Sequence, residues 1–330
     1  MKILYAVQGT GNGHVSRASE IVPLLKEFGD VDVLISGIQS DLDLDFEVKY
    51  RFYGLGFIFG KKGGVDLWQT FMKSKPLRLL ADIQSLPVNE YDLVISDFEP
   101  VSSWACKLKR KACIGLSHQN AVLLRGAPIP KEKDRLGSFI LKHYAPSSVK
   151  IGFHFNDFTE NVYTPVIREK IRRANSSNKG HFTVYLPAYS DEEIISVLGL
   201  LDNIRWQVFS KHTQNEYEKD NILVRKVSVD GFTKSFLSCA GILCTAGFEA
   251  PAEALFLGKK LCVIPMINQY EQQCNAAFLE SMGIRVIQTL KGNDAVLRNW
   301  INEENTIQIN YPDQTSEILK MLVSGYGNRE

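Results

Sequence analysis

Residues 2–14 read KILYAVQGTGNGH, a short apolar run that ends in three spaced glycines and a histidine. An apolar pattern with helical spacing follows from Val15 to Phe28. A strand, a glycine-rich turn and a helix in this order are typical of the first unit of a parallel α/β fold. Glycines let backbone N–H groups approach a ligand closely, and a helix start adds positive potential. We therefore expect a ligand-binding loop at Gly9–His14.

The GTGNGH turn differs from the dinucleotide-binding fingerprint. That fingerprint needs GxGxxG and an acidic residue at the end of the second strand. Here the second predicted strand ends in Ile35-Ser36-Gly37-Ile38, which has no acid at that position. No carboxylate lies between Gly9 and Ala18, so nothing in the loop opposes an anion. We therefore expect this loop to bind an anionic ligand, and we expect no cofactor. The alternative is that the loop is a tight turn that binds no ligand.

Short apolar runs alternate with helical patterns along the whole chain. This alternation predicts two parallel sheets with helices on both faces, that is, two Rossmann-like domains around a central cleft. The predicted strands of the first series are Ile3–Val7, Val31–Ser36, Glu47–Phe52, Leu93–Asp97, Ala112–Ser117 and Lys150–Phe155. Those of the second are Phe182–Leu186, Arg205–Phe209, Ile222–Arg225, Gly241–Cys244, Lys260–Ile264 and Arg285–Ile287. We predict domains at residues 1–160 and 161–310, and a helix within 311–330 that packs back on the first domain.

The composition argues against a nucleic-acid-binding, disulfide-bonded or secreted protein. The chain has 330 residues and a formal net charge of +1, which gives no electrostatic reason to expect nucleic acid as a partner. Its six cysteines form no CxxC pair and lie in apolar surroundings, which favours free thiols in a reducing compartment. The N-terminus shows no signal-peptide pattern, and the apolar stretch 237–258 is interrupted by Glu249, Pro251 and Glu253. We therefore expect a cytoplasmic protein.

Two residues at the predicted carboxyl edge of the first sheet are candidates for catalysis. His14 follows the first strand, and an imidazole titrates near neutral pH, so it can accept a proton from a hydroxyl group. Asp97 ends another strand at the same edge and would orient the imidazole as the acid of a catalytic triad does. The alternative for Asp97 is a cap on the helix that begins at Pro100. His118, after the strand Ala112–Ser117, is a competing base.

The most specific stretch of the chain is CTAGFEAPAEAL, residues 244–255, which continues through Gly258 and Pro265 to QYEQQCNA, residues 269–276. Gly247 is predicted to open a helix whose amides face a diphosphate. Glu249 and Glu253 are four residues apart on one helical face, where two like charges are unfavourable unless they are solvated or bind a ligand. A ribose diol offers two hydroxyl donors to such a carboxylate.

This stretch resembles the donor-binding signature of GT-B-fold glycosyltransferases. It is particularly similar to that of the lipid-linked N-acetylglucosamine transferases of peptidoglycan synthesis and their prokaryotic relatives. The opening GTGNGH is similar to the N-terminal glycine loop of that family. The resemblance spans both ends of the fold and implies a nucleotide-sugar donor, UDP-linked, bound by the second domain, with the acceptor bound by the first.

The resemblance also implies roles for individual residues. Glu253 matches the acid that binds the ribose, and Phe232 matches the aromatic residue near the nucleobase. Thr245 and Gly247 match the helix start that holds the diphosphate. The remaining matches are Gln269, Gln272 and Gln273 for the donor sugar, Gly11 and Gly13 in the glycine loop, and His14 as base. Transfer by direct attack of the acceptor would invert the anomeric centre and need no metal.

The chain departs from this pattern after Leu186, where the family has a glycine–serine loop. Here Ser190 and Glu193 form a capping box, and three acids at the same helix start would repel a phosphate. The spacing Asp41-Leu42-Asp43 resembles a metal-binding DxD motif, but alternating Asp and Leu more simply gives one solvated face. We therefore expect no metal site.

Features of the first domain bear on the acceptor. Residues 57–64, with Trp68 and Phe71, read as an apolar lid, and the Lys-rich stretch 128–146 permits contact with the inner face of a membrane and a lipid-linked acceptor. The alternatives are a glycan acceptor and an amphipathic helix packed on the domain.

Two other functions stay open: a nucleotide-sugar epimerase on the same fold, and a nucleotide-sugar-binding protein without turnover.

Overall fold

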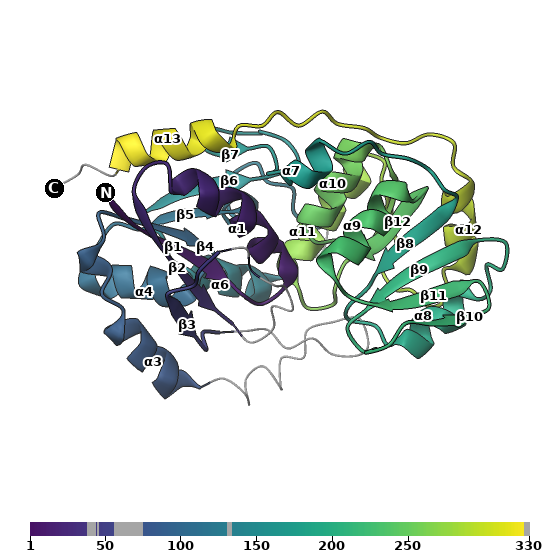
Figure 1. The fold of residues 1–330 in the computed structure, drawn as a ribbon, viewed down its shortest axis with the longest axis horizontal. Helices are drawn as coiled ribbons and strands as arrows, with labels where there is room; N and C mark the ends of the chain where they lie inside the picture. The colour runs from purple at the N-terminus through teal and green to yellow at the C-terminus, as the bar shows by residue number, and fades with distance from the viewer. Residues whose placement is uncertain (38–43, 45, 56–74, 131–133, 327–330) are drawn as a thin grey trace.

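The structure, a computed structural model, describes residues 1–37, 44, 46–55, 75–130 and 134–326. The predicted lid residues and the Asp41–Asp43 motif lie outside these ranges, as do Lys131 and Lys133. The described residues form two seven-stranded sheets side by side, each flanked by helices (Figure 1). The two-sheet α/β architecture predicted from the sequence is confirmed.

The first sheet has the strand order β3-β2-β1-β4-β5-β6-β7, and all of its pairs are parallel. The elements of this half are β1 (Lys2–Gln8), α1 (Asn12–Leu25), β2 (Asp30–Ser36), β3 (Tyr50–Phe52), α3 (Pro76–Ser85), η1 (Val88–Glu90), β4 (Leu93–Asp97), α4 (Pro100–Lys109), β5 (Ile114–Ser117), α5 (His118–Val122), α6 (Arg135–Tyr144), β6 (Val149–Phe153), β7 (Val162–Tyr163) and α7 (Glu169–Arg172).

The second sheet has the order β10-β11-β9-β8-β12-β13-β14 and is parallel except for the β10–β11 pair. Its elements are β8 (His181–Tyr185), α8 (Asp191–Leu198), β9 (Arg205–Ser210), β10 (Tyr217–Lys219), β11 (Ile222–Lys226), α9 (Val229–Ser238), β12 (Gly241–Thr245), α10 (Glu249–Leu257), β13 (Lys260–Ile264), α11 (Tyr270–Ser281), β14 (Arg285–Val286) and α12 (Asp294–Asn302). The last helix that the structure describes is α13 (Thr315–Tyr326).

β1 shows why the central strands are continuous apolar runs. Ile3, Tyr5 and Val7 face one core, which includes the apolar side of α1. Leu4 and Ala6 face another core, beneath α3 and α4. Since helices cover both faces of a parallel sheet, both sets of side chains are buried and the pattern does not alternate with polar residues.

The core that contains α1 extends into the second half of the chain. Phe155, just after β6, packs against Phe248 and Phe278, with ring centroids 5.0 and 5.7 Å apart. Ile318 and Leu319 of α13 belong to the same core, and Figure 1 shows α13 lying along the first sheet beside α1. The two sheets are therefore joined by buried apolar contacts as well as by the chain.

Two short strands were not expected from the sequence. β7 is only two residues long, and all three residues of β10 are exposed, so neither carries a hydrophobic pattern. The division into domains at residue 160 stays a prediction, and the change from one sheet to the other falls between Tyr163 and His181. In the part of the chain that the structure describes, no helix has the length and apolar character to cross a membrane.

Candidate active site

The GTGNGH loop leads from β1 directly into α1. Gly11 precedes the helix with φ at +96°, a backbone conformation that favours glycine. A Cβ on Gly13 would clash with the carboxylate of Glu249, which reaches this point from α10 of the other half. The backbone conformation therefore favours glycine at position 11, and the close approach of Glu249 favours it at position 13, whereas the donor-binding roles of both glycines stay predictions.

His14, on the first turn of α1, pairs with Asp97 at the end of β4. The two atoms that meet are His14 Nδ1 and Asp97 Oδ1, 2.8 Å apart. Arg17, one helical turn after His14, donates from Nε and Nη2 to the two Asp97 oxygens at 2.9 and 2.6 Å. The structure thus brings together the two residues proposed for catalysis and adds a buried cation.

The cap on α4 is Glu99, not Asp97. The Glu99 carboxylate accepts hydrogen bonds from the backbone N–H groups of Val101 and Ser102 at 2.7 and 2.6 Å. Asp97 is fully buried, and its oxygens bind His14 and Arg17 instead. The alternative that Asp97 caps this helix is therefore wrong.

The charges of this cluster shift the pKa values of its members in opposite directions. Burial lowers the pKa of His14, but the charge of Asp97 and its hydrogen bond raise it more, so the net shift is upward. Burial raises the pKa of Asp97, but Arg17 and His14 lower it further, so the net shift is downward. Asp97 therefore remains a carboxylate, which favours the imidazole tautomer with a proton on Nδ1 and a basic lone pair on Nε2.

His118 occupies a different setting at the start of α5. It is 1% exposed, and its ring stacks on Phe248 with centroids 3.9 Å apart. Both ring nitrogens have partners, the carbonyl oxygen of Phe153 at 2.8 Å and the side-chain oxygen of Asn275 at 2.7 Å. Burial lowers the pKa of His118 to about 3, with a further contribution from His154. This histidine joins the two halves of the molecule and is poorly placed to take a proton from a substrate.

The Nε2 atom of His14 faces a polar pair that sequence reasoning missed. The side-chain amide nitrogen of Gln119 lies 3.1 Å from it and donates to Glu271 Oε2 at 2.9 Å. Burial raises the pKa of the Glu271 carboxyl. The buried Gln119 Oε1 has no hydrogen-bond partner among the described residues. Polar atoms of this kind suit the recognition of a hydroxyl group beside the imidazole.

The start of α10 is the predicted diphosphate site. It follows Thr245, which ends β12 and is buried, and no side chain caps it. A Cβ placed on Gly247 would meet only Thr245 Oγ1, at 3.9 Å, so there is open space in front of this glycine. Glu249, in the first turn, forms an ion pair with Arg17.

Glu253 is buried and not solvated. Its two oxygens accept hydrogen bonds from Arg168 Nε and Nη2 at 2.6 and 2.7 Å. The like charges of Glu249 and Glu253 are therefore each balanced by an arginine from outside α10. The ribose-binding role of Glu253 stays a prediction, and a ribose would have to compete with Arg168 for this carboxylate.

The other predicted donor contacts lie on α9 and around the start of α11. Gln272 is buried, and its side-chain oxygen accepts a hydrogen bond from the Met266 N–H at 3.0 Å, which fixes the loop after β13. Gln269 and Gln273 are partly buried. Phe232 packs against Tyr185 and Phe209 at the carboxyl ends of β8 and β9, with ring centroids 5.8 and 5.4 Å apart. Their roles toward a sugar or a base stay predictions.

Comparison with known proteins places the chain in a family. The model of the family described as glycosyl transferase family 1 matches residues 1–303. The chain belongs to this family. No curated protein sequence matches it.

The transferase is similar in fold to solved structures along nearly its whole length. Acinetobacter baumannii MurG is 13% identical with a TM-score of 0.55, and the match covers 98% of this chain and 99% of that one. S. aureus MnaA, solved with UDP, is 14% identical with a TM-score of 0.59 and coverage of 98% and 96%. The glycosyltransferase SnogD from Streptomyces nogalater is 12% identical with a TM-score of 0.54 and coverage of 98% and 99%. The transferase therefore has the GT-B fold.

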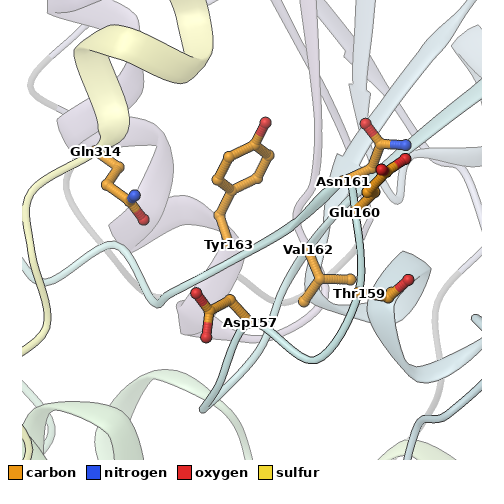
Figure 2. Close-up of a pocket in the computed structure, with 7 residues that line it drawn as sticks. All are labelled: Asp157, Thr159, Glu160, Asn161, Val162, Tyr163 and Gln314. Carbon is orange, nitrogen blue, oxygen red and sulfur yellow. The ribbon is translucent and has the colours of Figure 1, made fainter.

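A surface pocket elsewhere on the transferase does not suit a nucleotide sugar. It is lined by residues of the β6–β7 loop, by β7 and by Gln314, which precedes α13 (Figure 2). The carboxylates of Asp157 and Glu160 lie at this pocket, and they would repel a diphosphate. Among the residues that the structure describes, no group of three or more His, Cys, Asp or Glu side chains is arranged to hold a metal ion.

Four residues that were not predicted contact the candidate site residues directly or through one another: Arg17, Arg168, Gln119 and Glu271. A signal existed for Arg17 alone, because it stands three residues after His14 on the same helix, a spacing that places the two side chains on one face. The other three are brought in by long-range contacts, with partners 85 to 152 positions away in the sequence. Such contacts leave no local pattern.

Proposed function

We propose that this transferase moves a sugar from a UDP-linked donor to a hydroxyl group of an acceptor, with His14 as the base. The observation that carries the proposal is the His14–Asp97 pair, which lies at the edge of the first sheet while α10 begins without a side-chain cap on the second. A base and a helix start of this kind supply the two groups that such a transfer needs.

The proposed step is a direct displacement. The acceptor oxygen bonds to the anomeric carbon as the bond from that carbon to the diphosphate breaks, and His14 Nε2 takes the hydroxyl proton. Asp97 stabilises the imidazolium that forms, as its hydrogen bond to Nδ1 allows. The N–H groups at the start of α10 stabilise the negative charge of the departing diphosphate. The step inverts the anomeric centre and requires no metal in this scheme.

For the donor, we propose that the nucleotide binds along α10 and the aromatic cluster around Phe232. The MnaA structure with UDP shows that a molecule of this fold accommodates that nucleotide. For the acceptor, we propose the first domain, where the orphaned Gln119 Oε1 lies beside His14. A lipid-linked acceptor is favoured over a free glycan by α6, whose Leu136 and Phe139 are 61% and 62% exposed.

A thermal-shift series tests the donor part of the proposal. A ligand that binds only the folded state raises its stability by about 2.7 kcal/mol at 100 times Kd. We expect UDP and UDP-sugars to raise the Tm, and NAD to leave it unchanged. The proposal for the donor is wrong if no uridine nucleotide raises the Tm at millimolar concentration.

Substitution of His14 tests its proposed role as the base. Removal of a general base lowers the rate about 10²–10⁴-fold. We expect His14→Ala to keep the UDP-induced shift and to lose turnover by this factor. His118→Asn serves as a comparison at the same edge of the sheet, since His118 has no proton-transfer role here. Full activity of His14→Ala would remove His14 as the base.

One observation supports the epimerase alternative. Asp97, Glu249 and Glu271 all lie around His14, and an epimerase needs acids around the sugar ring. The two functions differ in what they consume. An epimerase converts the UDP-sugar to its epimer without any acceptor, whereas the transferase releases UDP only when an acceptor is present, and chromatography of the nucleotide products distinguishes the two.

A further inference from the structure

Arg17 lies at the centre of a charged cluster that contains one acid from each domain. On the side of its own domain it donates two hydrogen bonds to Asp97. On the other side, Nη1 donates to Glu249 at the start of α10. The side chain of Arg17 is only 2% exposed. A guanidinium presents its donors in a rigid fork, so it holds the two carboxylates in a fixed relation.

The Glu249 side chain packs closely against the start of α1. The carboxylate lies so near Gly13 that a side chain at that position would fit only if the Glu249 side chain moved. α1 has no acid in its own first turn, so the second domain supplies the negative charge at this helix start. This contact exists only while the start of α10 is seated against α1.

Arg17 and His14 share the same acceptor atom. Asp97 Oδ1 lies 2.8 Å from His14 Nδ1 and 2.6 Å from Arg17 Nη2, and Nη2 is itself 3.1 Å from His14 Nδ1. While Glu249 binds Arg17 Nη1, the guanidinium is divided between two carboxylates. Without Glu249, the cation would be balanced by Asp97 alone, and it would compete more strongly with His14 for Oδ1.

We propose that Arg17 is a positioning residue through which the seating of α10 against α1 sets the charge and orientation of the His14–Asp97 pair. The inference rests on the proposed role of His14 as base. It goes further because it makes the base depend on a residue of the other domain. In a transferase with a cleft, this arrangement prepares the base only when the donor-binding domain is in place.

Several charged or titratable groups face this pair, each from a different element. They are Tyr5 on β1, Arg17 on α1, Glu249 on α10 and Glu271 on α11, the last through Gln119. Tyr5 donates a long hydrogen bond of 3.4 Å to Asp97 Oδ2. Of these groups, Glu249 alone bonds to Arg17 from the second domain, so its substitution removes this contact between domains.

The test is an NMR titration of the His14 imidazole, with His14→Gln used to assign the signal. Glu249→Gln keeps the shape and an oxygen acceptor but removes the charge. We expect the midpoint for His14 to fall by about half a pH unit or more, because a negative charge near the imidazolium is lost. The matched control is Glu216→Gln, which breaks the ion pair with Arg225 (2.6 Å) on the second sheet, remote in sequence from His14, and should not move the midpoint.

An unchanged His14 midpoint in folded Glu249→Gln would overturn the inference, as would an equal change in Glu216→Gln. If Glu249→Gln does not fold, Glu249→Asp shortens the reach to Arg17 by one methylene and is expected to give a smaller fall of the same sign. No change in that variant also counts against the role of Arg17. The titration needs neither donor nor acceptor, so its result is independent of whether the protein transfers a sugar.

Discussion

At the scale of the residue, the proposed base His14 can accept a proton only in its neutral form. Asp97 holds the pKa of His14 above the usual value of 6.5. We therefore expect kcat/KM to rise with pH through a midpoint above 6.5, since protons must leave His14 before it can act. In Asp97→Asn, the charge that raises the pKa of His14 is lost, while the burial that lowers this pKa remains. The midpoint should therefore move to lower pH. The rate at high pH should fall about 10²–10⁴-fold.

The dependence of kcat/KM on pH, measured for the unmodified enzyme and for Asp97→Asn, tests this prediction. Asp97→Asn also leaves Arg17 with one carboxylate fewer, so its folding must be checked by circular dichroism before kinetics are compared. A profile whose midpoint is the same in the two enzymes would show that the titrating group is not the partner of Asp97.

The pair Arg168–Glu253 allows a sharper test of the ribose site. Glu253→Gln and Arg168→Gln both break the same buried ion pair, and each should destabilise the fold by about 3 kcal/mol. Only Glu253 is proposed to bind the nucleotide, and a hydrogen bond to a charged group contributes about 1.5–3 kcal/mol. We therefore expect Glu253→Gln to weaken UDP binding at least about tenfold and Arg168→Gln to preserve or strengthen it.

Calorimetric titration with UDP, together with the Tm of each variant, separates the two effects. Equal losses of affinity in both variants would mean that the ion pair supports the site only through the fold, and that Glu253 does not contact the ribose.

At the scale of the element, the sequence predicts the sheets better than it predicts the site. β1, β4, β12 and β13 are apolar runs because both faces of each strand are buried, and that requirement can be read locally. The N-cap half of the capping box at Ser190 is confirmed, since its hydroxyl accepts a hydrogen bond from the Glu193 N–H. The pairing of Glu249 with Arg17 had no such signal, because it depends on how two separate sheets are placed against each other.

Helix α6 packs on the fold, as one alternative from the sequence expected, and membrane contact stays a prediction. Leu141 and Tyr144 pack inward, and Gly137 approaches Tyr270 of α11, while Leu136 and Phe139 remain exposed. The helix therefore packs on the fold and still presents an apolar surface, with Lys142 and His143 in its last turn.

If this surface of α6 meets a membrane, the double variant Leu136→Ser, Phe139→Ser should bind anionic vesicles at least about tenfold more weakly, because a buried Leu or Phe contributes about 1.5–3 kcal/mol. Sedimentation with phosphatidylglycerol vesicles measures the binding. The control is Leu77→Ser on α3, an equally apolar side chain that is 84% exposed. Membrane contact through α6 is refuted if the double variant and the control bind alike.

At the scale of the whole molecule, α13 completes a core that begins at the other end of the chain. Leu319 is fully buried in the core that also contains Ile3, Val15 and Ile21. We expect Leu319→Ala to lower the free energy of unfolding by about 2–5 kcal/mol. Lys320→Ala, its exposed neighbour, should change it by less than about 0.5 kcal/mol. Urea denaturation measures both, and similar values for the two variants would show that α13 does not contribute to this core.

The position of α13 also affects how the protein folds while it is being synthesised. During synthesis, β1 and α1 leave the ribosome long before α13, the helix that covers part of the apolar surface of α1. The core around α1 therefore cannot reach its final packing until α13 has been released. Until then the nascent chain exposes a hydrophobic strip along α1, which is the kind of surface that chaperones bind and that leads to aggregation when they are absent.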